Sequence, residues 1–232
     1  MAAVKRTGSP ENEAAAKRPR ASPEKEVIKT AIKGYLDFCP HVPGIRSPTL
    51  LHEVRSWVFV ESSDAITAGT PALVRKPPVT IYGKQCFQQR SVGYFALPGV
   101  PPYPYNPAMV LPCQEMPPAI KEAMETLNRV LDTQLNSCLA NFYADGSEYI
   151  SAHQDNEKTI APNSPVVAVS LGETRTFRIR DSKTNKIVLD LPLPSGSVVI
   201  MRNQVDYKHE IPKQLKKRGS RWSLTFRQIQ KV

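Results

Sequence analysis

The chain has 232 residues, enough for one sizeable domain with an appendage, and its 41% hydrophobic content predicts a folded core. Thirty-one basic against 21 acidic residues give a net charge of +10, which favours a polyanionic partner, nucleic acid before an anionic membrane surface; a solvated basic surface is the alternative. No apolar run approaches the roughly 20 residues of a membrane span, and four scattered cysteines without a signal segment predict a soluble, intracellular protein with reduced thiols.

Residues 1–33 are polar and carry almost no large apolar side chains. They cannot bury enough surface to offset the entropy of ordering, so we expect a disordered tail ahead of a folded domain at 34–232. Two basic clusters about ten residues apart, Lys5–Arg6 and 17–20, are typical of a bipartite nuclear-import signal. A merely solvated basic tail explains them equally well. The sequence therefore favours the nucleus, and otherwise the cytoplasm.

The first expected helix begins at Ser47, as the capping residue, with Pro48 in its first turn. Its apolar positions follow with helical spacing at Leu50, Leu51, Val54, Trp57 and Val58.

The segment 71–118 is rich in proline and interleaves aromatic with basic residues. The aromatic residues are Tyr82, Phe87, Tyr94, Phe95, Tyr103 and Tyr105, and the basic ones Arg75, Lys76, Lys84 and Arg90. Such a mixture suits stacking on bases and pairing with phosphates, which indicates a segment that contacts nucleic acid. The alternative is a proline-braced cover whose aromatic side chains pack inward, and we expect at least half of them to do so.

A second helix opens at Pro117–Pro118, and strands follow it. The apolar stripe of the helix is Ile120, Met124, Leu127, Leu131 and Leu135. The expected strands are 139–143, 166–171, 176–180, 187–191, 197–201 and 222–228. Helices followed by short strands predict an α+β, mainly β fold, a double-stranded β-helix (jelly roll) with supporting helices, whose catalytic core spans 139–229.

A candidate metal site combines His153, Asp155 and His209. On extended backbone His153 and Asp155 point to one side and Gln154 to the other, while His209 comes from another strand or loop. Two imidazoles and one carboxylate are typical of Fe(II) sites that leave three positions open. A His-x-Asp pair alone is weak, but the chain has only four histidines and two of them occupy these positions.

A candidate anion site combines Arg221 and Arg227, which lie on one face of the last expected strand. The planar fork of arginine binds carboxylates in a bidentate manner, so the pair can clamp a small dicarboxylate beside the metal. Asn141 and Tyr143 share a face and can add hydrogen bonds. The alternative is that both arginines are surface charges.

At these residues the chain resembles the AlkB family of Fe(II)/2-oxoglutarate-dependent dioxygenases. The similarity runs from roughly residue 36 to 229 and is densest over 141–227. The matching segments are Asn141-Phe-Tyr143, His153-Gln-Asp155-Asn-Glu157, Arg175-Thr-Phe177-Arg-Ile-Arg180, Leu191-Pro-Leu-Pro-Ser-Gly196-Ser-Val, His209 and Arg221-Trp-Ser-Leu-Thr-Phe-Arg227.

The resemblance implies that Fe(II), 2-oxoglutarate and O₂ are required, and that the iron ligands, also the catalytic residues, are His153, Asp155 and His209. It implies that Arg221 pairs with the distal carboxylate of 2-oxoglutarate and Arg227 with the carboxylate near the metal, and that Asn141 and Tyr143 help to hold the same molecule. The implied chemistry is oxidation of an N-alkyl group on a nucleobase, with conversion of 2-oxoglutarate to succinate and release of formaldehyde.

The upstream segment 71–118 is similar to the nucleotide-recognition lid of this family. Tyr82 resembles an aromatic that enters the base stack, and Arg90 is expected beside the resulting gap. Tyr103 and Tyr105 are expected against the extruded base.

Two positions depart from the family pattern. Many repair members carry a second acid directly after the metal-binding Asp, where this chain has Asn156; Glu157 is then the nearby acid for base recognition, and a preference for cationic lesions is in doubt. Ser223 replaces an Asn that is common between the two arginines in this family, which weakens one expected hydrogen bond without removing the clamp.

The leading hypothesis is a monomeric nuclear enzyme that removes N-methyl groups from DNA bases such as 1-methyladenine and 3-methylcytosine. The same chemistry on RNA is the main alternative, because single strands lower the cost of flipping a base. A protein hydroxylase or demethylase on this fold and a non-catalytic binding module are further alternatives. The lid composition argues against the former, and the intact ligand set against the latter.

Overall fold

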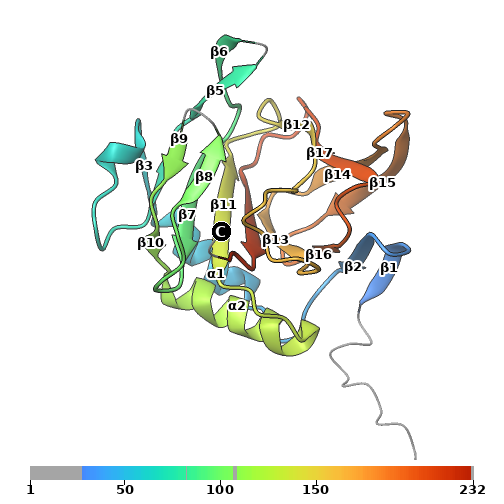
Figure 1. Ribbon diagram of the computed structural model, residues 1–232, viewed down its shortest axis with the longest axis horizontal. Coiled ribbons are helices and arrows are strands. Elements are labelled where there is room, and N and C mark those ends of the chain that lie inside the picture. Colours follow the sequence, from blue (N-terminus) through green and yellow to red (C-terminus); the bar gives the residue numbers. More distant parts are fainter. Residues whose placement is uncertain (1–27, 82, 107–108, 231–232) are drawn as a thin grey trace, which may run out of the picture.

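The structure is a computed structural model that describes residues 28–81, 83–106 and 109–230 (Figure 1). The helices are α1 Ser47–Arg55 and α2 Pro118–Leu131, with a short 3-10 helix at Ser63–Ala65. The strands are β1 Lys29–Ile32, β2 Leu36–Cys39, β3 Val58–Val60, β4 Ala72–Val74, β5 Pro78–Ile81, β6 Lys84–Phe87, β7 Ser91–Ala96, β8 Tyr103–Asn106, β9 Met109–Leu111, β10 Gln114–Glu115, β11 Ser137–Tyr143, β12 Ile150–His153, β13 Val166–Gly172, β14 Arg175–Asp181, β15 Ile187–Leu193, β16 Val198–Met201, β17 Tyr207–Ile211 and β18 Arg221–Arg227.

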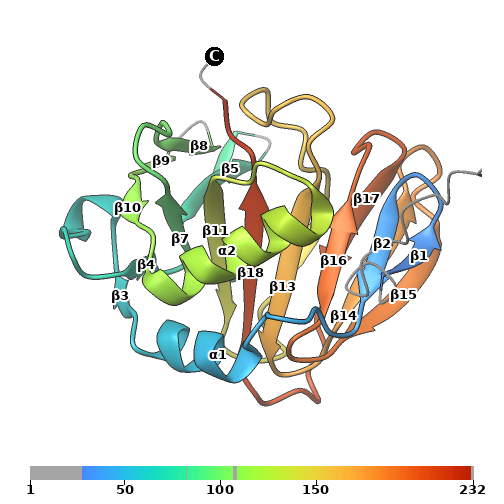
Figure 2. The ribbon, with the colours of Figure 1, turned by 90° about the horizontal axis from the view of Figure 1, so that it is seen from below.

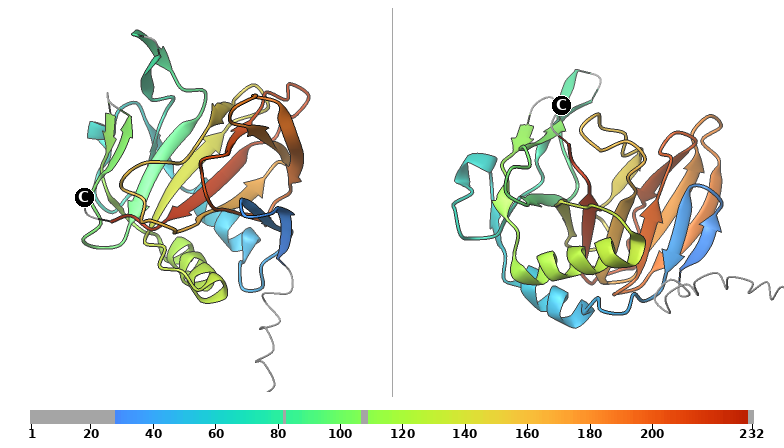
Figure 3. Two further views of the ribbon diagram at one scale, coloured as in Figure 1. Left: turned by 45° about the vertical axis from the view of Figure 1, so that its right-hand side comes forward. Right: turned by 60° about the horizontal axis from the view of Figure 1, so that its bottom comes forward.

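Two sheets form the body of the molecule. The major sheet has ten strands in the order β1-β2-β16-β13-β18-β11-β7-β4-β3, with β10 beside β7, and the minor sheet has four in the order β12-β17-β14-β15. The sheets face each other across a core to which both contribute, including Tyr143 and Val199 from the major sheet and Phe177 and Ile179 from the minor one (Figure 3). This arrangement confirms the expected mainly β, jelly-roll fold with supporting helices.

The two helices cover the outer face of the major sheet (Figure 2). Because side chains alternate along β18, Trp222, Leu224 and Phe226 pack toward the helices, whereas Arg221 and Arg227 face the minor sheet. The last strand therefore separates an apolar core from a polar interior.

Both helices begin where the sequence predicts, with local corrections. Arg46 is the N-cap of α1, and Ser47 already belongs to the helix, which ends at Arg55 because the chain then turns into β3. In α2 the buried stripe is Ile120, Ala123, Met124, Leu127 and Val130. Leu131 is only half-buried, and Leu135 is buried beyond the helix end.

The six predicted strands correspond to β11, β13, β14, β15, β16 and β18. Two expected boundaries are wrong: the start of the folded domain at residue 34 and the extent of the lid at 71–118. β1 lies within 1–33 and pairs with β2, so the folded part reaches back at least to Lys29; the basic clusters lie outside the described residues.

The expected lid, 71–118, is not one unit. β4, β7 and β10 belong to the major sheet, and only the hairpins β5–β6 and β8–β9 form separate two-stranded sheets. Figure 1 shows β5–β6 projecting from the end of the molecule near β12. Tyr94, Phe95 and Tyr103 are buried, which confirms inward packing for half of the six aromatics.

Neither described helix has the length and apolar character needed to cross a membrane.

Candidate metal centre and co-substrate pocket

Strand register brings the two histidines together. β12 and β17 pair in antiparallel fashion with His153 directly opposite His209, and the imidazole centroids lie 4.3 Å apart. Phe177 of the neighbouring strand β14 stacks on His209 at 5.3 Å. The Nδ1 atom of His153 lies 2.9 Å from the Ser151 carbonyl, which leaves Nε2 free for a metal.

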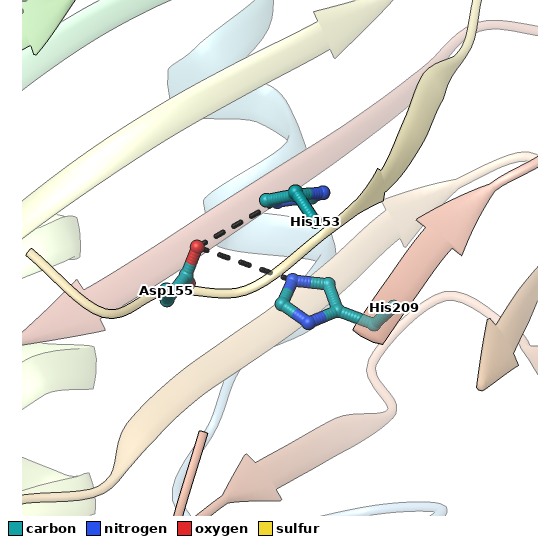
Figure 4. A group of neighbouring side chains, drawn as sticks. All are labelled: His153, Asp155 and His209. Atoms are coloured by element: carbon teal, nitrogen blue, oxygen red, sulfur yellow. Dashed lines mark ion pairs between the residues drawn. The ribbon is translucent and has the colours of Figure 1, made fainter. Parts of the chain in front are cut away.

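Asp155 completes the cluster two residues beyond the end of β12 (Figure 4). Its Oδ1 atom lies 3.6 Å from Nε2 of His153 and 4.0 Å from Nε2 of His209. One donor atom from each of the three side chains lies within 4.8 Å of the others, as one shared ion requires. The structure thus confirms that His153, Asp155 and His209 form a metal-binding cluster.

Arg227 of the major sheet holds the carboxylate of Asp155 from the other side. Its Nη2 atom donates a hydrogen bond of 2.8 Å to Oδ2, and both side chains are buried. Since Oδ2 faces the guanidinium and Oδ1 faces the imidazoles, Asp155 offers one oxygen to a metal.

The electrostatics of the cluster favour a cation. Burial lowers the pKa of His209 to about 3 and also lowers the pKa of His153, so both imidazoles are neutral at pH 7 and can donate lone pairs. Burial alone would raise the pKa of Asp155, but Arg227 and the two histidines outweigh burial and hold that pKa well below its usual value. Two neutral nitrogens and one anionic oxygen are the donor set of a non-haem ferrous site.

A cavity of about 160 Å³ extends from the cluster between the two sheets. Arg221 lies in its wall and is 1% exposed. Burial lowers the pKa of this guanidinium to about 10, so it remains a cation at neutral pH. Nη2 donates to Ser170 Oγ at 2.9 Å, whereas Nε and Nη1 are buried and have no hydrogen-bond partner among the described residues.

These unpaired donors fit a dicarboxylate co-substrate. A buried cation with two unused donor nitrogens is costly unless an anion pairs with it. Tyr143, opposite Arg221 in the strand register, lies 5.5 Å from the guanidinium, and Asn141 lies on the same face of β11. Nε of Arg227 is also buried, again with no partner in residues 28–81, 83–106 and 109–230. One carboxylate at Arg221 and another near Arg227 would satisfy these groups.

The expected base-recognition residues are not all in the cavity. Tyr103, Tyr105, Arg90 and Glu157 line it. Asn156 is exposed and does not line it, so Glu157 is the acid that faces inward at this end. Tyr82 lies outside the described residues.

Three hydrogen bonds connect the side chains of these cavity residues. The hydroxyl of Tyr103 donates to Oε1 of Glu157, while Oε2 of Glu157 is buried and has no hydrogen-bond partner within the part of the chain that the structure describes. Arg90 is 7% exposed and donates to Asn141 and Tyr105, a contact with the co-substrate end of the cavity that the sequence did not predict.

Three functional side chains were missed by the sequence analysis. Ser170 lies opposite Ser223 in the register of β13 and β18 and binds Arg221, which only the strand pairing reveals. Gln88 accepts a hydrogen bond from Tyr105. Arg175 is buried and donates to the carbonyls of residues 145, 148 and 212, joining two loops beside β12. The sequence offered one indication of this role, because Arg175 belongs to the same matching segment as Phe177.

Comparisons with known proteins agree with this geometry. A model of the 2OG-Fe(II) oxygenase superfamily matches residues 60–227. Among curated proteins, the chain is 28% identical over 202 residues to "DNA oxidative demethylase ALKBH2" of Arabidopsis thaliana, covering 75% of this chain and 62% of that protein. It is 29% identical over 181 residues to the human protein of the same name (74% and 67% covered) and 28% identical over 138 residues to mouse "Alpha-ketoglutarate-dependent dioxygenase alkB homolog 3" (55% and 48%).

The chain thus spans less than two thirds of the length of two of these three relatives. Among solved structures, OsALKBH1 superposes with a TM-score of 0.55 at 18% identity, covering 87% of this chain and 99% of that chain, which supports the fold.

Asp155→Ala should weaken binding of Mn(II), a redox-stable surrogate for Fe(II), by at least about 100-fold, because it removes the single anionic ligand. Titration calorimetry under anaerobic conditions measures the affinity. Asp190→Ala, which removes an exposed carboxylate paired with Arg178, is the matched control and should bind Mn(II) like the unmodified protein. Equal Mn(II) affinity in the folded Asp155 variant would mean that the ion binds elsewhere.

Proposed function

We propose that the chain, which belongs to the 2OG-Fe(II) oxygenase superfamily and within it to the AlkB family, oxidatively removes N-methyl groups from DNA bases, such as 1-methyladenine and 3-methylcytosine. The observation that carries the proposal is the pairing of a His-Asp-His metal cluster with a buried arginine that has two unused donors in the same cavity. The relatives named DNA oxidative demethylase supply the substrate class.

The residues of the chain divide the work between binding and positioning. Bound Fe(II), with 2-oxoglutarate and O₂, supplies the oxidising chemistry that the protein itself lacks. His153, Asp155 and His209 hold the metal on one side of the cavity. Arg221, with Ser170 and Tyr143 beside it, holds the distal carboxylate, and Arg227 serves both Asp155 and the carboxylate near the metal.

The mouth of the cavity suits a flipped methylated base. Tyr103 and Tyr105 present aromatic rings, and burial raises the pKa of both hydroxyls, so they remain neutral donors. The unpartnered Oε2 of Glu157 can accept a hydrogen bond from an exocyclic amino group and offset the charge of a cationic base. Although residue 156 is the neutral Asn156, the cavity therefore still contains an acid, Glu157.

Entry of the base requires it to leave its stack, at a cost of a few kcal/mol. We assign this step to the β5–β6 hairpin, whose turn carries Tyr82 in the sequence and which projects from the molecule (Figure 1). Basic residues of the loop after β17, Lys213, Lys216, Lys217 and Arg218, supply charge for phosphates.

The test is formaldehyde release from oligonucleotides of one sequence, prepared as single-stranded DNA, duplex DNA and RNA, each with one 1-methyladenine or 3-methylcytosine. We expect Fe(II)- and 2-oxoglutarate-dependent release with a higher kcat/KM on DNA. Equal or faster turnover of RNA would favour the RNA alternative. Turnover of a peptide substrate that the oligonucleotides fail to inhibit would favour a protein hydroxylase. If the metal-loaded protein turns over none of these substrates, a non-catalytic binding module would be favoured.

Arg221→Lys should raise the KM for 2-oxoglutarate about 10- to 100-fold with a smaller change in kcat, because lysine keeps the charge but loses the bidentate fork. Initial rates at saturating oligonucleotide give both constants. Arg178→Lys, on an exposed ion pair of the minor sheet, is the control and should leave the KM unchanged. An unaltered KM in Arg221→Lys would place the co-substrate elsewhere.

We further propose that residues 1–27 direct the protein to the nucleus, on the basis of their two basic clusters. Replacing Lys17, Arg18 and Arg20 together by alanine should shift a fluorescent fusion toward the cytoplasm, as microscopy would show. The same change should leave demethylation of oligonucleotides intact. An unchanged distribution would contradict this assignment.

A further inference from the structure

A directed chain of hydrogen bonds links the recognition hairpins to the co-substrate pocket. Arg90, between β6 and β7, donates from Nε to Oδ1 of Asn141 at 2.8 Å and from Nη2 to the Tyr105 hydroxyl at 2.8 Å. The Tyr105 hydroxyl in turn donates to Oε1 of Gln88 at 2.7 Å. Tyr105 belongs to the β8–β9 hairpin and Gln88 directly follows the β5–β6 hairpin, so the chain spans both.

The contact with Arg90 decides the orientation of the Asn141 amide. Arginine has donors and no acceptor, so the amide atom that faces it must be the oxygen. The amide nitrogen then points the other way and lies 3.5 Å from the Leu139 carbonyl, the outer limit of a hydrogen bond. Since Asn141 is 8% exposed and lines the cavity, this N–H₂ group is available to an oxygen of a bound ligand.

The backbone fixes the geometry of this contact. β7 pairs with β11 so that Val92 lies opposite Asn141, and Arg90 is two residues before Val92 on the same face. A diagonal neighbour with a long side chain reaches across such a pair. The major sheet therefore fixes the position of the Arg90 backbone, while the second donor of Arg90, Nη2, is bonded to Tyr105 of the β8–β9 hairpin.

From this geometry we infer that Arg90 is a positioning residue: it orients the Asn141 amide to donate to 2-oxoglutarate and thereby couples co-substrate binding to engagement of the recognition hairpins by nucleic acid. The inference rests on the proposed function, which supplies the ligand and the polymer. Nucleic acid that shifts Tyr105 or Gln88 changes the hydrogen bonds that restrain Arg90. The orientation of the Asn141 amide, and with it the donor offered to the co-substrate, then changes too. Because coupling is reciprocal, 2-oxoglutarate must change the affinity for nucleic acid by the same factor.

The first test measures 2-oxoglutarate binding to Mn(II)-loaded protein by calorimetry, without turnover. Arg90→Met keeps the length of the side chain and removes its donors; it should weaken 2-oxoglutarate about three- to tenfold and leave Mn(II) affinity unchanged. Arg178→Met makes the same change of charge on the minor sheet, where Arg178 pairs with Asp190, and should leave both affinities unchanged. Equal 2-oxoglutarate affinity in Arg90→Met and unmodified protein would overturn the inference.

A double-mutant cycle separates positioning from direct contact. In an Asn141→Ala background there is no amide to orient, so adding Arg90→Met should weaken 2-oxoglutarate by less than about twofold more. Additive losses would mean that Arg90 acts on the ligand directly or through the general fold, and would contradict the assigned role.

The second test measures the affinity of Mn(II)-loaded protein for a 1-methyladenine oligonucleotide, with and without saturating 2-oxoglutarate, by fluorescence anisotropy. Unmodified protein should bind the oligonucleotide at least about fivefold differently in the two conditions, and the ratio should fall to near one in Arg90→Met. A ratio of one in unmodified protein, or an unchanged ratio in the variant, overturns the coupling. Unmodified protein that does not bind 2-oxoglutarate at all contradicts the proposed function instead, so the two failures are distinguishable.

Discussion

The buried ion pair between Arg227 and Asp155 is the interaction on which the site depends. Arg227 belongs to the major sheet, and Asp155 follows the edge strand of the minor sheet, so the 2.8 Å contact joins the sheets at the cavity. Desolvating two charges offsets most of the attraction, and such a pair contributes little net stability. What it does is fix geometry, because the oxygen left free by Arg227 is the one that faces His153 and His209.

The alternation of β18 creates the second constraint. One face of this strand packs tryptophan, leucine and phenylalanine under the helices, and the other presents Arg221 and Arg227 to the cavity. Burying a polar face this deeply is costly unless its donors are satisfied, and within the described part of the chain two donor atoms of Arg221 have no partner. The folded chain has thus already met the cost of burying that cation, and a dianionic ligand recovers the missing interaction. Affinity for the co-substrate follows from this incomplete pairing more than from the size of the cavity.

The sequence predicted what local pattern determines and missed what register determines. β18, α2 and the His153–Asp155 pair were predictable, because alternation and helical spacing are visible along the chain. β12 and β17 were not predicted: they are short and carry polar ligands instead of a regular apolar face. The roles of Ser170 and Arg90 depend on which strands are neighbours in the sheet. The same holds for β7, which belongs to the major sheet although its aromatic residues suggested a lid.

The segment from His153 to Glu157 carries the two metal-binding residues His153 and Asp155 and, two residues further on, the acid Glu157. Side chains at 153, 155 and 157 line the cavity, while Gln154 points away and donates to the Val205 carbonyl. Glu157, the acid that lines the cavity, follows the metal-binding carboxylate of Asp155 by two residues. Two hydrogen bonds hold this segment in place, from Arg227 to Asp155 and from Tyr103 to Glu157. Asn156 is exposed and points away from the cavity, which explains how asparagine can stand there while the acid that lines the cavity is retained.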